Sequence, residues 1–499
     1  MAAVSSSKAG NELSLGRRLR HGAAWVVVGR TLGIGTTILV GVATPRFLSA
    51  QEYAAFALVS SVIVFAGGLA MFGLNGTMVR FLSERLGTGD LGGAARVLRV
   101  GLKLAIASSA VVAAATGIIM AAGGMRWFDL PVDPVVTMLV CAGVALLALQ
   151  QLAAESLRGF HELRLASVLS GGQFGGPITN LLFLAGLFAV VQFIPDSNLN
   201  LRITLGLFVV ALAFTAPASL ICLRRTARRS LSGVETNRTA QADRGELRSI
   251  VAVCTPLAIL CGLSFAATQA DLWIAGAFCA KGDVALYAAA RRLAVMVSMP
   301  LQMINLTVMS SIPELYIKGR TAALQRLLRR AAVIGAAPSV ACLVVILFNP
   351  AAVLGFVFGD YYRGAAELLV LLSFGQLALV MAGSCALTLA LTGHQRTALR
   401  ISLLSAAVLG IAGPVATYLF GPRGLAVAVV AATITECGLQ WGITRKVLGV
   451  WTHCTPREAF TAVRQWRAAR AMRAPVEPAP AALAASESSV SACSTQLGA

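Results

Sequence analysis

The sequence predicts an all-α polytopic membrane protein with about twelve transmembrane helices, and three observations support this fold class. Hydrophobic residues make up 57% of the 499-residue chain, charged residues only 12%, and the mean hydropathy is +0.78. A soluble domain carries about a quarter of its residues as charged side chains, so a water-soluble fold is excluded. Long apolar stretches fill nearly the whole chain, and most Lys and Arg residues lie in alternate gaps between them.

Each predicted span is an apolar stretch long enough to cross a bilayer core, which takes about 20 residues of helix. Because apolar patterns fix the existence of a helix better than its ends, the boundaries carry an error of several residues. The predicted spans are 22–44, 54–74, 99–122, 133–157, 164–193, 200–223, 248–279, 283–311, 331–359, 364–392, 397–420 and 423–446.

The net charge of +20 follows the same organisation, because the basic residues are spread over one set of loops and not gathered on one surface. This argues against nucleic acid as a partner. The loops after spans 2, 6 and 8 are basic, as are both termini, whereas the intervening loops hold few basic residues. The positive-inside rule then places both termini in the cytoplasm, and an even number of spans agrees.

The chain also repeats itself, which predicts two six-helix lobes related by a parallel internal repeat. The two copies have the same orientation in the membrane because each holds six spans, an arrangement found in secondary transporters. Three matches in the same order carry the repeat: Gly89–Arg99 with Gly319–Arg329, Leu157–His161 with Leu391–Gln395, and Gly176–Pro177 with Gly413–Pro414. Each Gly-Pro pair is expected to break or bend its helix.

Five regions follow from the spans and the repeat. They are a cytoplasmic N-terminal segment 1–21, an N-lobe 22–223, a basic linker 224–247, a C-lobe 248–446, and a basic, disordered tail 447–499. The arginines of the linker are expected at anionic headgroups, where each contributes about 1 kcal/mol of attraction, so membrane lipids are predicted partners.

Five charged residues lie deep inside predicted spans, about eight or more residues from either end: Arg30, Asp271, Arg291, Arg292 and Glu436. Such residues cost about 2.5–3.5 kcal/mol each on insertion scales and usually serve a pathway or a partner. At 1.5 Å rise per residue, Asp271 before the end of span 7 and the two arginines after the start of span 8 reach the same depth. These three side chains are therefore expected to meet.

Two interpretations of this group compete. In the first, Asp271 pairs with Arg291 or Arg292 as a structural ion pair that holds the helical hairpin. In the second, Arg30 and one arginine of span 8 line a cationic cavity for a pyrophosphate, because guanidinium forks bind phosphate oxygens bidentately and keep their charge in a low dielectric. Glu436 is expected to find a hydroxyl or amide partner, or else to be a proton or cation site.

Six segments carry a pattern by their order and spacing: 25–30, 43–58, 73–84, 269–276, 283–293 and 312–316. With these segments, residues 15–446 resemble the bacterial polysaccharide and O-antigen flippases, the polysaccharide biosynthesis proteins of the multidrug/oligosaccharidyl-lipid/polysaccharide exporter superfamily. Ala54 and Ala285 depart from the pattern, since these families usually have Gly beside the tyrosine.

The resemblance implies a flippase in the bacterial inner membrane. Such a protein moves an undecaprenyl-pyrophosphate-linked oligosaccharide across the bilayer by alternating access, for surface or exopolysaccharide biosynthesis. It also implies a cationic cavity built from helices 1, 2, 7 and 8, and a polysaccharide polymerase and chain-length machinery as partners.

No enzyme signature is present in the sequence. A Walker A phosphate loop is absent, and the ten cysteines and four histidines lack the spacing of metal ligands, so neither a cofactor nor a metal is expected. Two other classes remain open. A cation-coupled multidrug exporter of the same superfamily would carry acidic residues in its cavity, and a non-transporting component of a polysaccharide-assembly complex would tolerate replacement of Arg30, Arg291 and Arg292.

Overall fold

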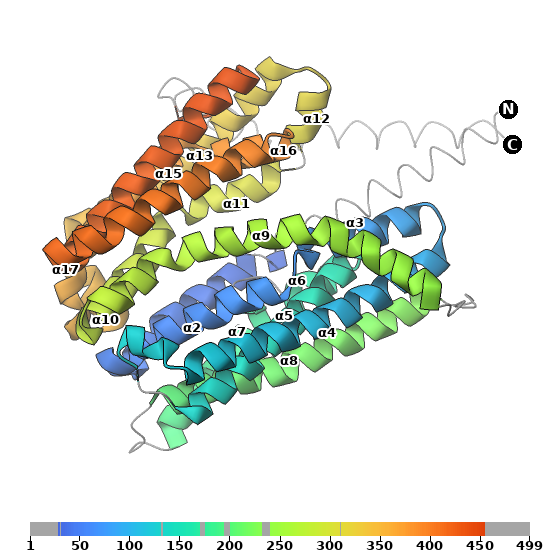
Figure 1. The fold of residues 1–499 in the computed structure, drawn as a ribbon. Coiled ribbons are helices and arrows are strands. Elements are labelled where there is room, and N and C mark those ends of the chain that lie inside the picture. The colour runs from blue at the N-terminus through green and yellow to red at the C-terminus, as the bar shows by residue number, and fades with distance from the viewer. Residues whose placement is uncertain are drawn as a thin grey trace, which may run out of the picture. The chain divides into compact units, whose positions relative to one another are not determined.

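The computed structural model describes residues 28–29, 31–130, 133–169, 175–193, 200–231, 240–309 and 311–454, and all secondary-structure elements in these ranges are helices. In the first half a helix over residues 31–47 precedes the labelled elements of Figure 1. Those elements are α2 (Ala50–Ala70), α3 (Leu74–Gly87), α4 (Leu91–Ala121), η1 (Gly124–Phe128), α5 (Pro134–Gly159), α6 (Leu163–Leu169), α7 (Pro177–Phe193) and α8 (Leu201–Ser230).

The second half begins with α9 (Ala240–Phe278), which packs against α2, α3 and α4 as well as against α17. It is the long helix at the centre of Figure 1. The remaining elements are α10 (Lys281–Ala294), η2 (Val295–Val297), α11 (Met299–Val308), α12 (Ser311–Ile317), α13 (Thr321–Phe348), α14 (Pro350–Phe358), η3 (Asp360–Ala365), α15 (Ala366–Ala382), α16 (Cys385–Leu391) and α17 (Gln395–Leu448).

Eight helices of the described ranges are long and apolar enough to cross a membrane, or nine if α10 and α11, bent by 45°, form one span. The helix over 31–47, the broken pair α6 and α7, and the division of α17 into two arms complete the predicted twelve. The chain is thus an all-α polytopic membrane protein, as the composition predicts.

Helix α17 folds back on itself at Gly421. Its 54 residues would reach about 80 Å if straight, far more than the ~30 Å of a bilayer core. Gly421 has φ 61° and ψ −151°, which only glycine adopts readily, and the two arms then hydrogen-bond: the Ser405 hydroxyl donates to the carbonyl of Ala432 at 3.0 Å. The break lies where the sequence separates spans 11 and 12.

The boundaries predicted for span 9 are wrong. Residues 331–359 were expected to form one helix, but α13 ends at Phe348 and α14 begins at Pro350. A residue before proline avoids the helical region, and Asn349 is extended at φ −154° and ψ 81° while its side chain accepts from the amide of Ala352 at 2.9 Å. The apolar residues beyond 349 therefore form a separate short helix.

The internal repeat is visible in the backbone of the turns before α4 and α13. Gly89 and Gly319 both have positive φ, 75° and 66°. The amides of Asp90 and Arg320 donate to the carbonyls five residues earlier, those of Arg85 and Leu315. The same hydrogen bonds recur 230 residues apart, the offset found in the sequence.

The second sequence match is shifted by two residues. In the loops after α5 and α16, the residues with positive φ are His161 and Gly393, so these two positions correspond, and not Gly159 and Gly393. The Gly-Pro pairs also differ. Pro177 begins α7, whereas Pro414 lies inside the first arm of α17, where Gly421 is the residue with non-helical φ and ψ.

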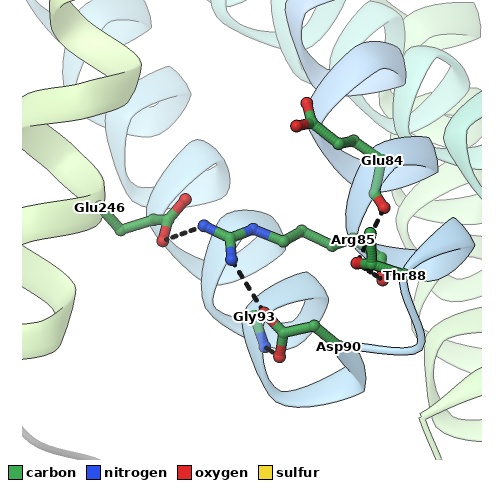
Figure 2. Close-up of polar contacts among 6 residues, drawn as sticks. All are labelled: Glu84, Arg85, Thr88, Asp90, Gly93 and Glu246. Carbon is green, nitrogen blue, oxygen red and sulfur yellow. Dashed lines mark hydrogen bonds and ion pairs between the residues drawn. The ribbon is translucent and has the colours of Figure 1, made fainter.

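One ion pair of Arg85 joins α9 to the end of the first half that carries the basic loops, which we call the basic end. The Arg85 guanidinium lies 2.9 Å from an oxygen of Asp90 and 3.4 Å from one of Glu246, a mostly buried side chain of α9. Figure 2 shows Arg85 reaching between these two carboxylates. The other Asp90 oxygen accepts from the amide of Gly93 at 2.7 Å, so Asp90 also caps α4.

Candidate functional site: a polar cavity

A cavity of about 900 Å³ is walled by the helix over 31–47, α2, α9, α10, α11, α15, α16 and both arms of α17. Most of its lining comes from the second half of the chain. The lining is rich in amide and hydroxyl groups. The side chains with an amide or hydroxyl group are Thr37, Tyr53, Ser60, Ser61, Ser264, Thr268, Gln269, Gln302, Asn305, Gln376, Ser384, Ser402, Ser405, Thr433 and Gln440.

Four of the five residues singled out from the sequence line this cavity: Asp271, Arg291, Arg292 and Glu436. The fifth, Arg30, lies outside the described residues. The long-range fold brings the four together from three helices, since Asp271 is on α9, the two arginines are on α10, and Glu436 is on the second arm of α17.

Asp271 pairs with Arg291. Nε of Arg291 lies 2.6 Å from Oδ2 of Asp271, and the Tyr287 hydroxyl donates to the same oxygen at 3.1 Å. The Arg291 guanidinium also donates to the carbonyl of Thr268 at 2.6 Å. The short turn between α9 and α10 places these residues at equal depth, which is the reason they meet. The other oxygen of Asp271 is buried with no hydrogen-bond partner.

Arg292 faces the first half of the chain. It packs so closely against the helix over 31–47 that a Cβ added at Gly41 would lie 2.5 Å from its Nε. Tyr53, a buried residue of α2, lines the same cavity as Arg292. Arg292 therefore links the two halves beside the cavity, and glycine at position 41 makes room for it.

Glu436 has both kinds of partner that the sequence suggested. The Ser402 hydroxyl donates to its Oε1 at 2.5 Å, and the Gln440 amide donates to the same oxygen at 2.9 Å. Ser402 is on the first arm of α17, whereas Glu436 and Gln440 are on the second. The carboxylate thus joins the two arms at the cavity wall.

The charged side chains among the described lining residues are two arginines and two carboxylates. These four charges balance, and the excess of positive charge among the five residues singled out from the sequence comes from Arg30, which lies outside the described residues. In the part of the chain that the structure describes, no three His, Cys, Asp or Glu side chains converge as metal ligands do.

Sequence reasoning missed the neutral amides of the lining. Gln302 and Asn305 lie one turn apart on α11, and Asn305 accepts a hydrogen bond from the Ser384 hydroxyl. Gln302 in turn donates to Ser298 at 3.2 Å. Their spacing in an otherwise apolar helix was the available signal, because polar side chains inside membrane helices usually face a protein interior or a cavity.

At the end opposite the basic loops, which we call the far end, the two halves touch. Nε of Arg46 donates to the carbonyl of Val357 at 2.7 Å. The rings of Tyr53 and Tyr362 pack edge to face with centroids 6.0 Å apart. These contacts join the helix over 31–47 and α2 to α14 and η3, and so they close the halves together at the far end.

No family model matches the sequence, and no curated protein matches it. Solved structures do share its fold. An inward-facing multidrug resistance MATE family transporter of the MOP superfamily aligns with a TM-score of 0.64 and 14% identity, covering 84% of this chain and 94% of that chain. Lipid II flippase MurJ, in an inward closed conformation, aligns with a TM-score of 0.60 and 12% identity, covering 91% and 93%.

A MOP superfamily transporter from Pyrococcus furiosus, described as having a binding pocket of reversed polarity, aligns with a TM-score of 0.58 and 14% identity. The match covers 86% of this chain and 95% of that one. At these identities the likeness shows the fold alone. The fold is that of the MATE transporters and the lipid II flippase, with two six-helix lobes related by a parallel repeat.

Proposed function

We propose that the protein is a transporter of the MOP superfamily that flips a polyprenyl-pyrophosphate-linked oligosaccharide across the bacterial inner membrane, for surface or exopolysaccharide biosynthesis. The observation that carries the proposal is a cavity that combines two arginines with many amides and hydroxyls, in a fold shared with a lipid II flippase. It is not proposed to be an enzyme.

The chemistry of the lining fits such a headgroup. Guanidinium groups bind the oxygens of a pyrophosphate bidentately, and amides and hydroxyls exchange hydrogen bonds with the hydroxyls of a sugar. Asp271 holds Arg291 in place, and Arg292 lies between the two halves. A pyrophosphate bound to both arginines would therefore lie next to the contacts between the two halves, which must break when the far end opens.

Alternating access gives the direction of movement. The headgroup enters the cavity from the basic end, which the positive-inside rule places in the cytoplasm together with both termini. The two halves then rock, the far-end contacts open, and the headgroup leaves on the other side. We propose that this rocking unit consists of an N-lobe 22–223 and a C-lobe 248–446, joined by the linker 224–247 and followed by the tail 447–499.

The membrane potential favours this direction. Moving an anionic group outward through an inside-negative potential contributes about 2.3 kcal/mol per charge per 100 mV. Arg30 belongs to the proposed set of cavity residues with Arg291, Arg292 and Asp271. A polysaccharide polymerase and chain-length machinery are the protein partners that this function would require.

A cation-coupled multidrug exporter of the same superfamily is the second candidate, and one observation favours it. Two carboxylates, Asp271 and Glu436, line the cavity, and one Asp271 oxygen is buried without a partner. Glu436→Gln keeps the acceptor oxygen for Ser402 and Gln440 but removes the charge. If Glu436 couples transport to a cation, this variant loses the dependence of transport on that cation; if the role is structural, the dependence remains.

The experiment that separates the candidates uses a strain from which the gene is deleted. Surface polysaccharide and lipid-linked precursor are measured in parallel after complementation with wild type, Arg291→Ala or Arg292→Ala, at matched membrane levels. The flippase function predicts loss of polymer and accumulation of precursor on the cytoplasmic side. Normal polymer in the deletion strain, together with altered drug sensitivity, would support the exporter. Loss of polymer in the deletion strain with normal polymer in both arginine variants would support a non-transporting role.

A further inference from the structure

A cluster of aromatic and basic side chains lies at the basic end of the second half, away from the cavity. It consists of Arg329 on α13, Trp441 and Arg445 on the second arm of α17, and Trp451 and His453 in the segment that follows α17. We call these five residues the Trp441 cluster. None of them lines the cavity described above.

Contacts between the side chains of the cluster hold them in a defined arrangement. The rings of Trp441 and Trp451 lie with centroids 5.0 Å apart, and Cζ of Arg445 lies 3.4 Å from the centroid of the Trp451 ring. The Trp451 amide donates to Oε1 of Gln325 at 3.0 Å, which fixes the segment against α13. Arg329 follows Gln325 by one helical turn, so it shares that face of α13.

Not every donor of the cluster has an acceptor among the described residues. Nε of Arg329 is buried and has no hydrogen-bond partner. Nε1 of Trp441 donates to Nδ1 of His453 at 3.2 Å, so a neutral His453 carries its proton on Nε2, which is a second donor. Neither Arg329 nor Arg445 forms an ion pair with an acid of the described ranges. Such a site fits an anion with several acceptor oxygens.

The surroundings indicate that this anion is attached to an acyl chain. Val427, Ile434 and Trp441 follow one another at intervals of seven residues, about two helical turns, so they share one face of the second arm of α17, and Val427 and Ile434 are exposed. Tryptophan rings favour the interface between bilayer and water, and basic pockets between membrane helices on the cytoplasmic side bind anionic headgroups. We propose that the Trp441 cluster binds the phosphate of an anionic phospholipid, whose acyl chains lie along the apolar stripe of α17.

The test uses the full-length protein in detergent, titrated with phosphatidylglycerol or phosphatidylethanolamine and followed by native mass spectrometry. Wild type is expected to bind phosphatidylglycerol more tightly than phosphatidylethanolamine. The double variant Arg329→Ala and Arg445→Ala is expected to bind phosphatidylglycerol at least about tenfold more weakly, since each basic residue contributes about 1 kcal/mol.

The matched control is the double variant Arg326→Ala and Arg330→Ala, which removes two exposed arginines of α13 with the same loss of charge. It is expected to retain the affinity of wild type. An equal loss in both double variants, or equal binding of the two lipids by wild type, would overturn the proposal. Displacement of phosphatidylglycerol by millimolar inorganic phosphate would assign the site to free phosphate and overturn the lipid as its occupant.

A second measurement, the pH dependence of lipid binding, is made first on wild type. Partial burial and the positive charges of Arg329 and Arg445 lower the pKa of His453. These arginines and the rings of Trp441 and Trp451 are the charged and aromatic groups of the cluster around it. A bound phosphate opposes the two positive charges and raises this pKa, so the affinity of wild type for phosphatidylglycerol is expected to increase as the pH falls from 7.5 to about 5.5. His453→Gln should abolish that increase, whereas affinity independent of pH in wild type would contradict it.

Discussion

The two halves of the chain repeat one helical scaffold but treat their polar residues differently. In the first half, buried polar groups bind one another: the Asn180 amide donates to Thr36 and Thr37 at 3.2 and 3.1 Å, and the Gln150 amide donates to Thr179 at 3.0 Å. In the second half, the cavity exposes amides, hydroxyls and charges. The polar groups named in the first half thus bind one another, whereas the second half supplies most of the polar lining of the cavity.

The comparison can be made residue by residue on the helices that begin at Ala50 and Lys281, which start 231 residues apart. At that offset Ser60 and Ser61 correspond to Arg291 and Arg292, and Val40 corresponds to Asp271. Ser61 accepts a hydrogen bond from the indole of Trp273 at 2.8 Å. A few substitutions on a common scaffold thus distinguish a neutral wall from a charged one.

The largest effect is expected when the charged wall is converted to the neutral one. Asp271→Val, Arg291→Ser and Arg292→Ser together give the second half the residues of the first. Because the pair of opposite charges is removed as a unit, the protein should fold with little loss of stability. Transport should fall at least about a hundredfold, since hydrogen bonds to charged groups contribute about 1.5–3 kcal/mol each. Flipping of a polyprenyl-pyrophosphate oligosaccharide in liposomes measures this, and retained transport would show that the charges only hold the helices.

A smaller effect, on stability, should follow from Asp271→Ala alone. This variant leaves Arg291 beside the cavity without its carboxylate, and removal of one partner of a buried pair typically costs about 3–5 kcal/mol. The 31% exposed Arg291 side chain places the expected cost at the lower end. Thermal unfolding in detergent measures it. The double variant Asp271→Ala and Arg291→Ala should recover part of the loss, and additive losses would mean that the pair does not couple.

Substitutions at two glycines of the helix over 31–47 test whether the position of the Arg292 side chain matters for transport. Gly41→Ala places a Cβ 2.5 Å from Nε of Arg292, so the guanidinium must move, and transport should fall about tenfold if its position matters. Gly35→Ala is the matched control, because no atom lies within 4 Å of its added Cβ. The control should transport normally and gain up to about 1 kcal/mol of helix stability. Equal transport by the two variants would contradict a role for the position of Arg292 in transport.

The smallest effect concerns the turns that show the repeat most clearly. Asp90 caps α4, whereas Arg320 at the same position before α13 makes no side-chain cap. Asp90→Ala should therefore cost about 1 kcal/mol of unfolding free energy and Arg320→Ala almost none. The amide of Gly93 and the charge of Arg85 lower the pKa of Asp90. The stabilisation is thus complete above the ordinary aspartate pKa of about 4 and disappears as the pH falls through the lower folded value. A cost that stayed constant below pH 3 would contradict this origin.

The sequence predicted those parts of the fold that depend on apolar length and local chain geometry. The short turn between α9 and α10 predicted that Asp271 and Arg291 lie at the same depth in the membrane and pair, as they do. The sequence repeat predicted that the turn at Gly89 recurs at Gly319, and both glycines have positive φ. Span 9 was misplaced because the apolar pattern continues through Asn349, where the preference of a residue before proline ends the helix. The proline at position 350 was a signal for this helix end, but the span was placed by its hydropathy, which continues past the break.

The lining of the cavity was harder to predict than the spans. The seat of Arg292 against Gly41 depends on how two helices far apart in the sequence pack, which no local pattern encodes. The neutral amides of α11 and Glu436 share one cavity only because α17 folds back at Gly421. The charge balance of the site therefore required the tertiary structure.

The most direct test of the central claim is binding of the headgroup chemistry to the purified, full-length protein. A water-soluble pyrophosphate ester of the oligosaccharide, which lacks the polyprenyl chain, is titrated into wild type and into Arg292→Ala. Its affinity is measured by calorimetry at two salt concentrations. The account predicts binding by wild type that weakens with salt and falls at least about tenfold in the variant. Equal affinity in the two proteins would contradict a pyrophosphate site in this cavity.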